Sequence, residues 1–138
     1  MITAESPTRL HLRRELEAHL SRLGYTSARV VRSGPVAPEI VRRNPVRGRT
    51  VYGETVLHGD LDNPRCHERL LRFSQRRTRH RSSILFFIAI AEDDEPELLT
   101  LLERLEIRNG TRGGHVHVVP IAAPAATRRR ASAAGGRR

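Results

Sequence analysis

The stretch ILFFIAI at residues 84–90 forms, with the alanine that follows it, the longest apolar run in the chain, and it decides the fold that we expect. A continuous run of Ile, Leu and Phe is typical of a strand that is buried on both faces of a sheet. It is far shorter than the ~20 residues that a membrane-spanning helix requires. We therefore place it as a central strand of a sheet that lies between helices.

Three segments with apolar side chains at helical spacing surround this strand. Cap and stop signals predict a helix from Ser6-Pro7 to Gly24, a second from a cap at Asp62 or Asn63 to about Arg77, and a third near residues 95–105. Their apolar stripes are expected to be Leu12, Leu16, Leu20 and Leu23; Cys66, Leu70 and Phe73; and Leu98, Leu101, Leu102 and Leu105. The acidic residues 92–95 lead into the third helix.

The remaining strands are expected at residues 28–32, 36–43, 49–57 and 115–121. The turn signals Asn44-Pro45 and Arg47-Gly48 join the second and third of the chain's strands into a hairpin. The resulting order is α-β-β-β-α-β-α-β. This order predicts an α/β fold with a single mixed central sheet flanked by helices.

Length and composition predict one domain and a tail. We expect a folded domain over residues 1–121, which is long enough to bury a core without disulfides. Residues 122–138 are rich in Ala, Gly and Arg, with five arginines and no acid. Such a segment has too little apolar surface to offset the entropy of ordering, so we expect a disordered basic tail.

The charge balance is strongly basic. The chain has 25 basic residues, all of them Arg, against 15 acidic ones, and its net charge is +10. This excess indicates a polyanionic partner, and nucleic acid is the commonest one. Part of the Arg excess also fits the codon bias of a GC-rich genome, so an ordinary soluble protein from an Arg-biased proteome is the alternative.

Cysteine usage and the N-terminus predict a cytoplasmic protein without a membrane partner. The single cysteine, Cys66, excludes an intramolecular disulfide and suits a reducing compartment. The first residues have neither the basic region nor the apolar region of a signal peptide.

Two acids of the predicted hairpin are the candidate catalytic and metal-binding residues. Glu39 lies in one of the two hairpin strands and Glu54 lies in the other, so the hairpin brings their carboxylates together at one end of the sheet. Such a pair can hold Mg²⁺ beside a phosphodiester. In an extended strand, Val56 and His58 share the face of Glu54. We therefore count His58 as a candidate base or ligand.

Short motifs in this order resemble the restriction-endonuclease-like superfamily with its PD-(D/E)XK pattern, and most closely the archaeal-type Holliday junction resolvases. They are Glu15-Leu16, Gly24-Tyr25, VRSG at 31–34, PEIV at 38–41, YGE at 52–54 and ERLLRFS at 68–74. The resemblance covers residues 14–90. It implies a restriction-endonuclease-like fold and metal-dependent cleavage of DNA by carboxylates and one lysine. It also implies a homodimer, because two symmetric cuts need two sites.

The chain departs from the family pattern at two of its four functional positions. Glu39 stands where the family prefers Asp, and Glu54 matches the second acid. Val56 stands in the place of the catalytic lysine, and it can neither carry charge nor donate a proton. A first-helix glutamate of the resolvases could correspond to Glu15 or Glu17, although the best register puts Arg13 there. The resemblance therefore implies a degenerate site.

Arginines along the second helix are the candidate nucleic-acid-binding residues. Four of them recur at helical spacing and share one face, and three more follow the helix: Arg65, Arg69, Arg72 and Arg76, then Arg77, Arg79 and Arg81. Such a stripe can contact phosphates. A solvated helix face is the alternative reading. An arginine of this helix could also replace the missing positive charge, though not a base.

These observations predict a nucleic-acid-binding, nuclease-like protein, with DNA as its partner and a degenerate Mg²⁺-dependent phosphodiesterase site. The alternative is a catalytically inactive DNA- or RNA-binding or assembly module on the same fold. A third reading, a small basic interaction protein unrelated to nucleases, predicts no cleft that contains both Glu39 and Glu54.

Overall fold

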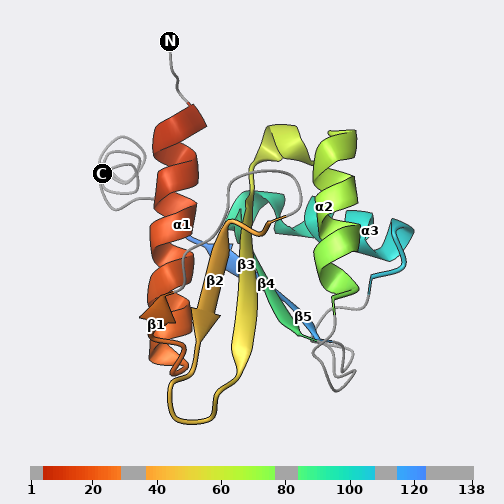
Figure 1. Ribbon diagram of the computed structural model, residues 1–138. Helices are drawn as coiled ribbons and strands as arrows, with labels where there is room; N and C mark the ends of the chain where they lie inside the picture. Colours follow the sequence, from red (N-terminus) through yellow and green to blue (C-terminus); the bar gives the residue numbers. More distant parts are fainter. Residues whose placement is uncertain (1–4, 29–36, 77–83, 108–114, 124–138) are drawn as a thin grey trace, which may run out of the picture.

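The computed structural model describes residues 5–28, 37–76, 84–107 and 115–123, with side chains from residue 9 onward in the first helix. Figure 1 shows the arrangement of its helices and strands. The elements are α1 (Glu5–Arg22), β1 (Ser27–Ala28), β2 (Ile40–Arg43), β3 (Thr50–Val56), the 3-10 helix η1 (His58–Asp60), α2 (Pro64–Ser74), β4 (Leu85–Ala91), the 3-10 helix η2 (Glu92–Asp94), α3 (Glu95–Arg104) and β5 (Val116–Ile121).

The five strands form one mixed sheet in the order β1-β2-β3-β4-β5. The pairs β1–β2 and β2–β3 are antiparallel, whereas β3–β4 and β4–β5 are parallel. The β2–β3 pair is the predicted hairpin, and the parallel part follows from the helical crossovers through α2 and α3. The prediction of an α/β fold with a single mixed sheet flanked by helices is confirmed.

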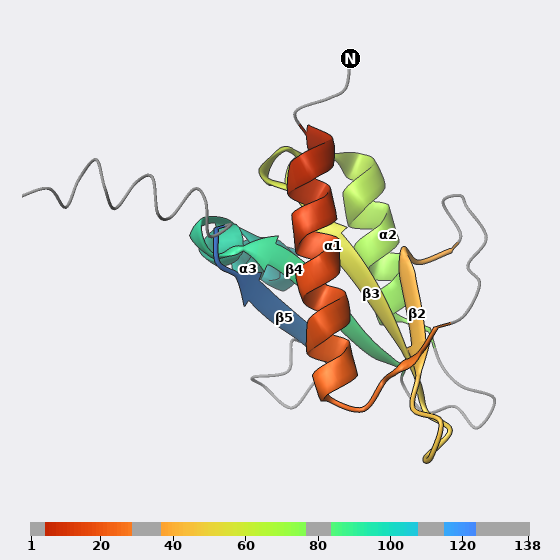
Figure 2. The same cartoon turned by 90° about the vertical axis from the view of Figure 1, so that its left-hand side faces the viewer.

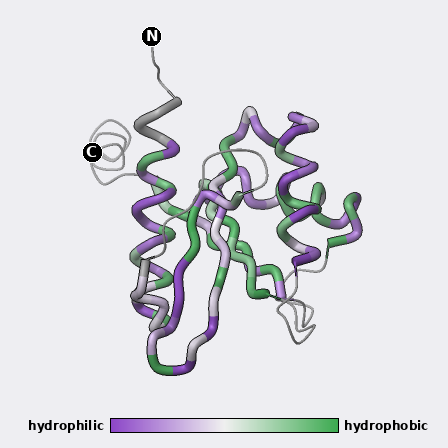
Figure 3. The backbone as a smooth tube through the Cα atoms, in the orientation of Figure 1, coloured by the Kyte–Doolittle hydropathy of each residue, from purple (hydrophilic) through white to green (hydrophobic). Residues whose placement is uncertain are grey.

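β4 shows why its sequence is apolar at every position. Phe86, Ile88 and Ile90 belong to the core on the side of α2 and α3, whereas Phe87 and Ala89 belong to the core on the side of α1. Figures 1 and 2 show α1 on one face of the sheet and the other two helices on the opposite face. Because successive strand residues point to opposite faces, both faces of β4 must be hydrophobic. Figure 3 shows the hydrophobic residues gathering along these inner strands.

The apolar stripe of α1 is confirmed for three of its four leucines. Leu12, Leu16 and Leu20 are buried against the sheet, but Leu23 is 50% exposed. The helix ends at Arg22, and Gly24 has a φ of +100°, a left-handed conformation that favours glycine. The chain therefore turns away before Leu23 can continue the stripe.

Several predicted boundaries differ from the observed ones by a few residues. α2 ends at Ser74 rather than near Arg77, and β2 begins at Ile40. Asn63 is the helix cap, since its side chain accepts the N–H of Arg65. Most of the strand predicted at 28–32 and of the tail at 122–138 lies outside the described residues. None of the helices in the described ranges combines the length and apolarity that crossing a membrane requires.

Candidate functional site

The end of the β2–β3 ladder positions the two predicted acids. The last backbone pair of β2 and β3 joins Ile40 to Gly53, and β3 then continues to Val56 beside β4, without β2 on its other edge. Glu39 comes directly before Ile40 and Glu54 directly after Gly53, so the two acids are the next residues beyond this pair. The Glu39 N–H donates a hydrogen bond of 2.6 Å to Glu54 Oε2, so the hairpin brings the two acids together.

The Glu39 side chain takes over the role of a strand partner. Its Oε1 accepts the Thr55 N–H at 2.8 Å and the Thr55 hydroxyl at 2.7 Å. A strand N–H near the core that lost its ladder partner would otherwise stay unsatisfied. Glu39 therefore has a structural function that the sequence did not indicate: it closes the open end of the hairpin.

Glu54 lies on the face of β3 that α2 covers, and its side chain is only 5% exposed. Arg69 of α2 binds it with two hydrogen bonds, from Nε to Oε1 at 3.0 Å and from Nη2 to Oε2 at 2.8 Å. The same Nη2 donates to the carbonyl of Ala37 at 2.8 Å. A bidentate guanidinium–carboxylate pair is among the strongest of protein hydrogen-bonded pairs.

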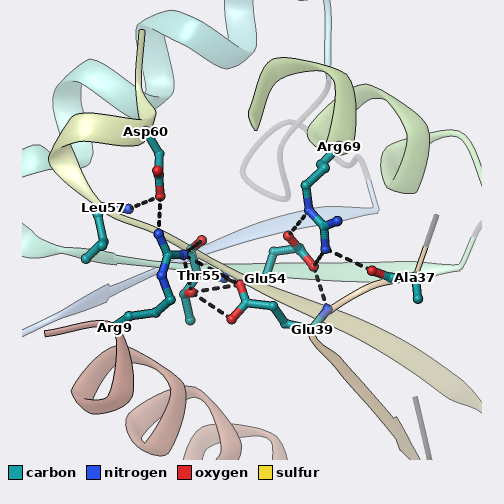
Figure 4. A network of polar contacts seen from close by, with 8 residues as sticks. All are labelled: Arg9, Ala37, Glu39, Glu54, Thr55, Leu57, Asp60 and Arg69. Atoms are coloured by element: carbon teal, nitrogen blue, oxygen red, sulfur yellow. Dashed lines mark hydrogen bonds and ion pairs between the residues drawn. The ribbon is translucent and has the colours of Figure 1, made fainter. Parts of the chain in front are cut away.

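A second arginine reaches the site from the opposite face of the sheet. Arg9 of α1 donates from Nη2 to Asp60 Oδ2 at 2.8 Å and from Nη1 to the Thr55 hydroxyl at 3.0 Å. Its Nη1 lies 3.9 Å from Glu39 Oε1. Asp60 in turn accepts the Leu57 N–H at 2.9 Å. Figure 4 shows how Arg9 and Arg69 approach the two acids from α1 and α2.

The two acids, Thr55, Asp60 and the two arginines line a cavity of about 370 Å³, together with Val56, Arg65 and Cys66. Burial raises the pKa of Glu54, and the charge of Glu39 acts in the same direction, while the hydrogen bond from Arg69 opposes both. Burial, helped by the charges of Asp60 and Glu54, raises the pKa of the Cys66 thiol to about 12. The thiol is therefore protonated at neutral pH and is no nucleophile.

The carboxylates in this arrangement do not fit Mg²⁺. Both oxygens of Glu54 accept hydrogen bonds from Arg69, which stands where a cation would have to bind. Mg²⁺ requires near-octahedral oxygen ligands and usually keeps several waters. Within the described residues, no group of three side chains at metal-ligand spacing includes Glu39 or Glu54. A metal ion could bind this pair only after Arg69 had moved away.

Of the two residues predicted to share the face of Glu54, Val56 borders the Glu39–Glu54 cavity and His58 does not. Val56 is 1% exposed and belongs to the core beneath α2 and α3, although one side of it borders the acidic cavity. β3 ends at Val56, so the strand alternation that would carry His58 to the face of Glu54 does not reach it. His58 does not line the cavity. Its ring is exposed, and the distance from its Nδ1 to Asp94 Oδ1, directly before α3, is 3.0 Å.

His58 instead belongs to a second acidic group beyond the ends of β3 and β4. Three possible ligand atoms, one each from His58, Asp94 and Glu97, lie within 4.8 Å of one another. This spacing would admit a metal ion, but it is equally that of an ion pair between an imidazole and two carboxylates at a helix start. The group is separate from the Glu39–Glu54 cavity.

The arginines of the stripe predicted on the second helix differ in their surroundings. Arg69 turns toward Glu54, and its guanidinium also lies 5.1 Å from the ring centre of Phe73. The Arg76 guanidinium lies 6.0 Å from the same ring. Arg72 pairs with Glu68 at 3.4 Å on the helix surface, and Arg65 is exposed. The other predicted contacts, Arg77, Arg79 and Arg81, lie outside the described residues.

Sequence reasoning missed Arg9, Thr55 and Asp60. The spacing of Arg9, Leu12 and Leu16 places all three on one helical face, so Arg9 could have been recognised as an inward-facing cation. Neither of the two first-helix glutamates that the resemblance suggests belongs to this site. Glu17 pairs instead with Arg42 at 3.2 Å and Arg13 at 3.5 Å, and Glu15 is exposed.

No family model, curated protein or solved structure matches the chain. A function must therefore be inferred from the chemistry of the acidic cavity and from the distribution of charge over the molecule.

Proposed function

We propose that the protein binds nucleic acid, with DNA as its partner, on a nuclease-like α/β fold whose acidic site is closed by an arginine. The observation that carries this proposal is the bidentate pairing of Arg69 with Glu54, the acid that matches the second metal ligand of the PD-(D/E)XK pattern. The resident guanidinium neutralises the carboxylate without a metal. The acidic site then stabilises the fold, while the basic surface remains for a polyanion.

Charge supports the binding part of the proposal. The chain carries a net charge of +10. In the cavity, Glu54, Glu39 and Asp60 have Arg69 and Arg9 close by, so the acids there are largely neutralised from within. A surface with excess arginine releases counterions from a phosphate backbone when it binds, which gives affinity with a steep dependence on salt.

The chemistry of the cavity supports the non-catalytic part. Phosphodiester cleavage needs a group that activates water, usually together with a metal. Val56 stands at the family's lysine position and is buried among apolar side chains. Cys66, with a pKa of about 12, holds its proton, and arginine cannot act as a base. The residues that line the cavity therefore offer no lysine and no imidazole.

A Mg²⁺-dependent endonuclease with a degenerate site is the second candidate function. It is favoured by the adjacency of Glu39 and Glu54 in a single cavity, with the Arg69 side chain 25% exposed at its rim. A substrate phosphate could draw Arg69 away and leave Glu54 for a metal. In that reading Arg69 would change partners during each binding event.

Binding and cleavage measured on the same samples separate the two candidates. Labelled duplex, single-stranded and four-way-junction DNA would be titrated at rising salt, and incubated with Mg²⁺ or Mn²⁺. We expect salt-sensitive binding without cuts, in the wild type and in Glu54→Gln alike. Glu15→Gln, an exposed acid outside the cavity, is the control.

Metal-dependent cuts that disappear in Glu54→Gln and persist in Glu15→Gln would replace the first candidate by the second. Absence of binding to every nucleic acid at low salt would overturn both. Sedimentation of the same samples would test the homodimer that the family resemblance implies.

A further inference from the structure

The β2–β3 hairpin ends in a basic tip, residues 43–49 with the sequence RNPVRGR. From residue 40 to residue 53 the chain has four arginines and no acid. Figures 1 and 2 show this turn projecting beyond the end of the sheet, at the end of the hairpin opposite to the acidic cavity. The tip is therefore a surface distinct from the site described above.

The conformation of the tip is held by its own hydrogen bonds. Asn44 Oδ1 accepts the N–H groups of Val46 and Arg47, both at 2.9 Å. The Gly48 N–H donates to the Asn44 carbonyl at 2.7 Å, and the Asn44 N–H donates to the Arg49 carbonyl at 2.8 Å. Gly48 has a φ of +71°, which closes the turn. A turn fixed in this way loses little entropy when it binds a partner.

The side chains of the tip are presented to solvent. Val46, near the apex, is 92% exposed, and Arg43, Arg47 and Arg49 around it are exposed as well. In the described part of the chain, none of these three arginines forms an ion pair with a carboxylate. Figure 3 shows a hydrophobic segment at the bottom of the hairpin between hydrophilic ones. An aliphatic side chain held in water among cations contributes nothing to the core, but it suits contact with bases between phosphates.

We propose that this tip enters the major groove of double-stranded DNA, with Arg43, Arg47 and Arg49 on phosphates and Val46 against base edges. The inference rests on the proposed nucleic-acid binding and adds its surface and substrate form. The B-DNA major groove, roughly 12 Å wide, admits a two-stranded β-ribbon, and thymine presents a methyl group there for an apolar contact. The major groove of duplex RNA is deep and narrow and excludes such a ribbon.

Disulfide trapping tests the groove directly. Val46→Cys would be incubated with duplex DNA that carries a tethered thiol on a base, in the major groove in one duplex and in the minor groove in another. We expect cross-linking with the major-groove tether only. Wild type is the control for the native thiol, because Cys66 is part-buried with a pKa of about 12. Preferential minor-groove trapping, or no trapping in a protein that binds, would overturn the proposal.

Salt titration tests the phosphate contacts. Arg47→Ala and Arg49→Ala should each reduce the slope of log K against log salt by about one. Val46→Asp, which puts a negative charge among phosphates, should weaken duplex DNA binding at least about tenfold. Arg104→Ala on α3, also an exposed arginine, is the matched control and should leave slope and affinity unchanged. Thermal unfolding would establish that each variant is folded, as expected for changes at exposed positions.

The outcomes distinguish this inference from the proposed function. If wild type binds duplex DNA and the three tip variants bind equally well, the tip is not the contact surface, although the nucleic-acid function stands. Tight binding to duplex RNA that depends on Val46 would also overturn the major-groove assignment. If wild type binds no nucleic acid at all, both proposals fail together.

Discussion

At the scale of single residues, Glu54 shows how a buried charge is retained near a protein core. Moving a carboxylate out of water is costly unless hydrogen bonds and an opposite charge compensate it. Glu54 receives two hydrogen bonds from Arg69 and one from the Glu39 N–H. These bonds hold α2 to β3 and to the segment that precedes β2. The pair therefore orients three parts of the chain.

Removing one partner of this pair should destabilise the fold. We expect Arg69→Met to lower the free energy of unfolding by about 3–5 kcal/mol at neutral pH, because Glu54 is left buried and unpaired. The double variant Glu54→Gln/Arg69→Met should recover part of that loss. Urea denaturation of the double-mutant cycle measures both effects, with Arg72→Met as the surface control on the same helix. Equal losses in Arg69→Met and Arg72→Met would contradict the structural role of the pair.

Two histidines beside Phe87 predict a loss of stability in mild acid. Burial lowers the pKa of His19 and of His117 below 6.5, helped by nearby Arg22 and by the other histidines. As the pH drops through 6.5, the unfolded chain therefore takes up protons before the folded one, and the free energy of unfolding decreases. His117 stacks on Phe87 with 5.0 Å between ring centres.

The variant His117→Phe should keep the stacking and lose less stability between pH 7 and pH 5.5 than the wild type. Melting temperatures at the two pH values measure the difference. The titration of Glu54 is common to both proteins and cancels in this comparison. If the two proteins lost the same amount, His117 would not be a source of the acid sensitivity.

At the scale of elements, the approach of α1 to the β2–β3 hairpin depends on a glycine. A Cβ at Gly53 would lie 3.1 Å from both Ile40 Cβ and Leu16 Cδ2. Gly53 forms the last pair of the ladder, directly before Glu54. A methyl group at this position would therefore require Ile40 or Leu16 to shift by a few tenths of an ångström.

The variant Gly53→Ala should therefore destabilise the protein by roughly 1–3 kcal/mol, the usual effect of overpacking a well-packed core. Gly59→Ala is the matched control, because a Cβ there meets no atom within 4 Å. Chemical denaturation of both variants gives the comparison. A Gly53→Ala protein as stable as Gly59→Ala would show that α1 can shift to accept the methyl group.

At the scale of the whole molecule, the β2–β3 hairpin separates two features of opposite character. One end carries the Glu39–Glu54 cavity, whose acids lie beside Arg9 and Arg69, and the other carries the exposed basic tip. This separation explains why substitutions in the cavity are expected to change stability, whereas those at the tip are expected to change binding. It also makes the two classes of variant independent controls for each other.

The fold class, the order of elements and the adjacency of two acids could be predicted from the sequence alone. Apolar periodicity, caps and turn residues act over about ten residues or fewer, and each is written in contiguous sequence. The run at residues 84–90 therefore identified a strand buried on both faces. The turn at residues 44–48 was enough to predict that Glu39 and Glu54 lie side by side. The family resemblance and the DNA partner stay predictions.

Only the tertiary structure decided what the two acids bind. Arg69 is 15 positions from Glu54, and Arg9 is 46 from Thr55 and 51 from Asp60, so no local pattern links them. These contacts exist because α1 and α2 pack on opposite faces of β3 and direct their arginines to the same strand end. The same packing buried Val56, and the end of β3 placed His58 with Asp94 instead. Long-range ion pairs depend on how helices and sheet meet, and that geometry is a property of the assembled core.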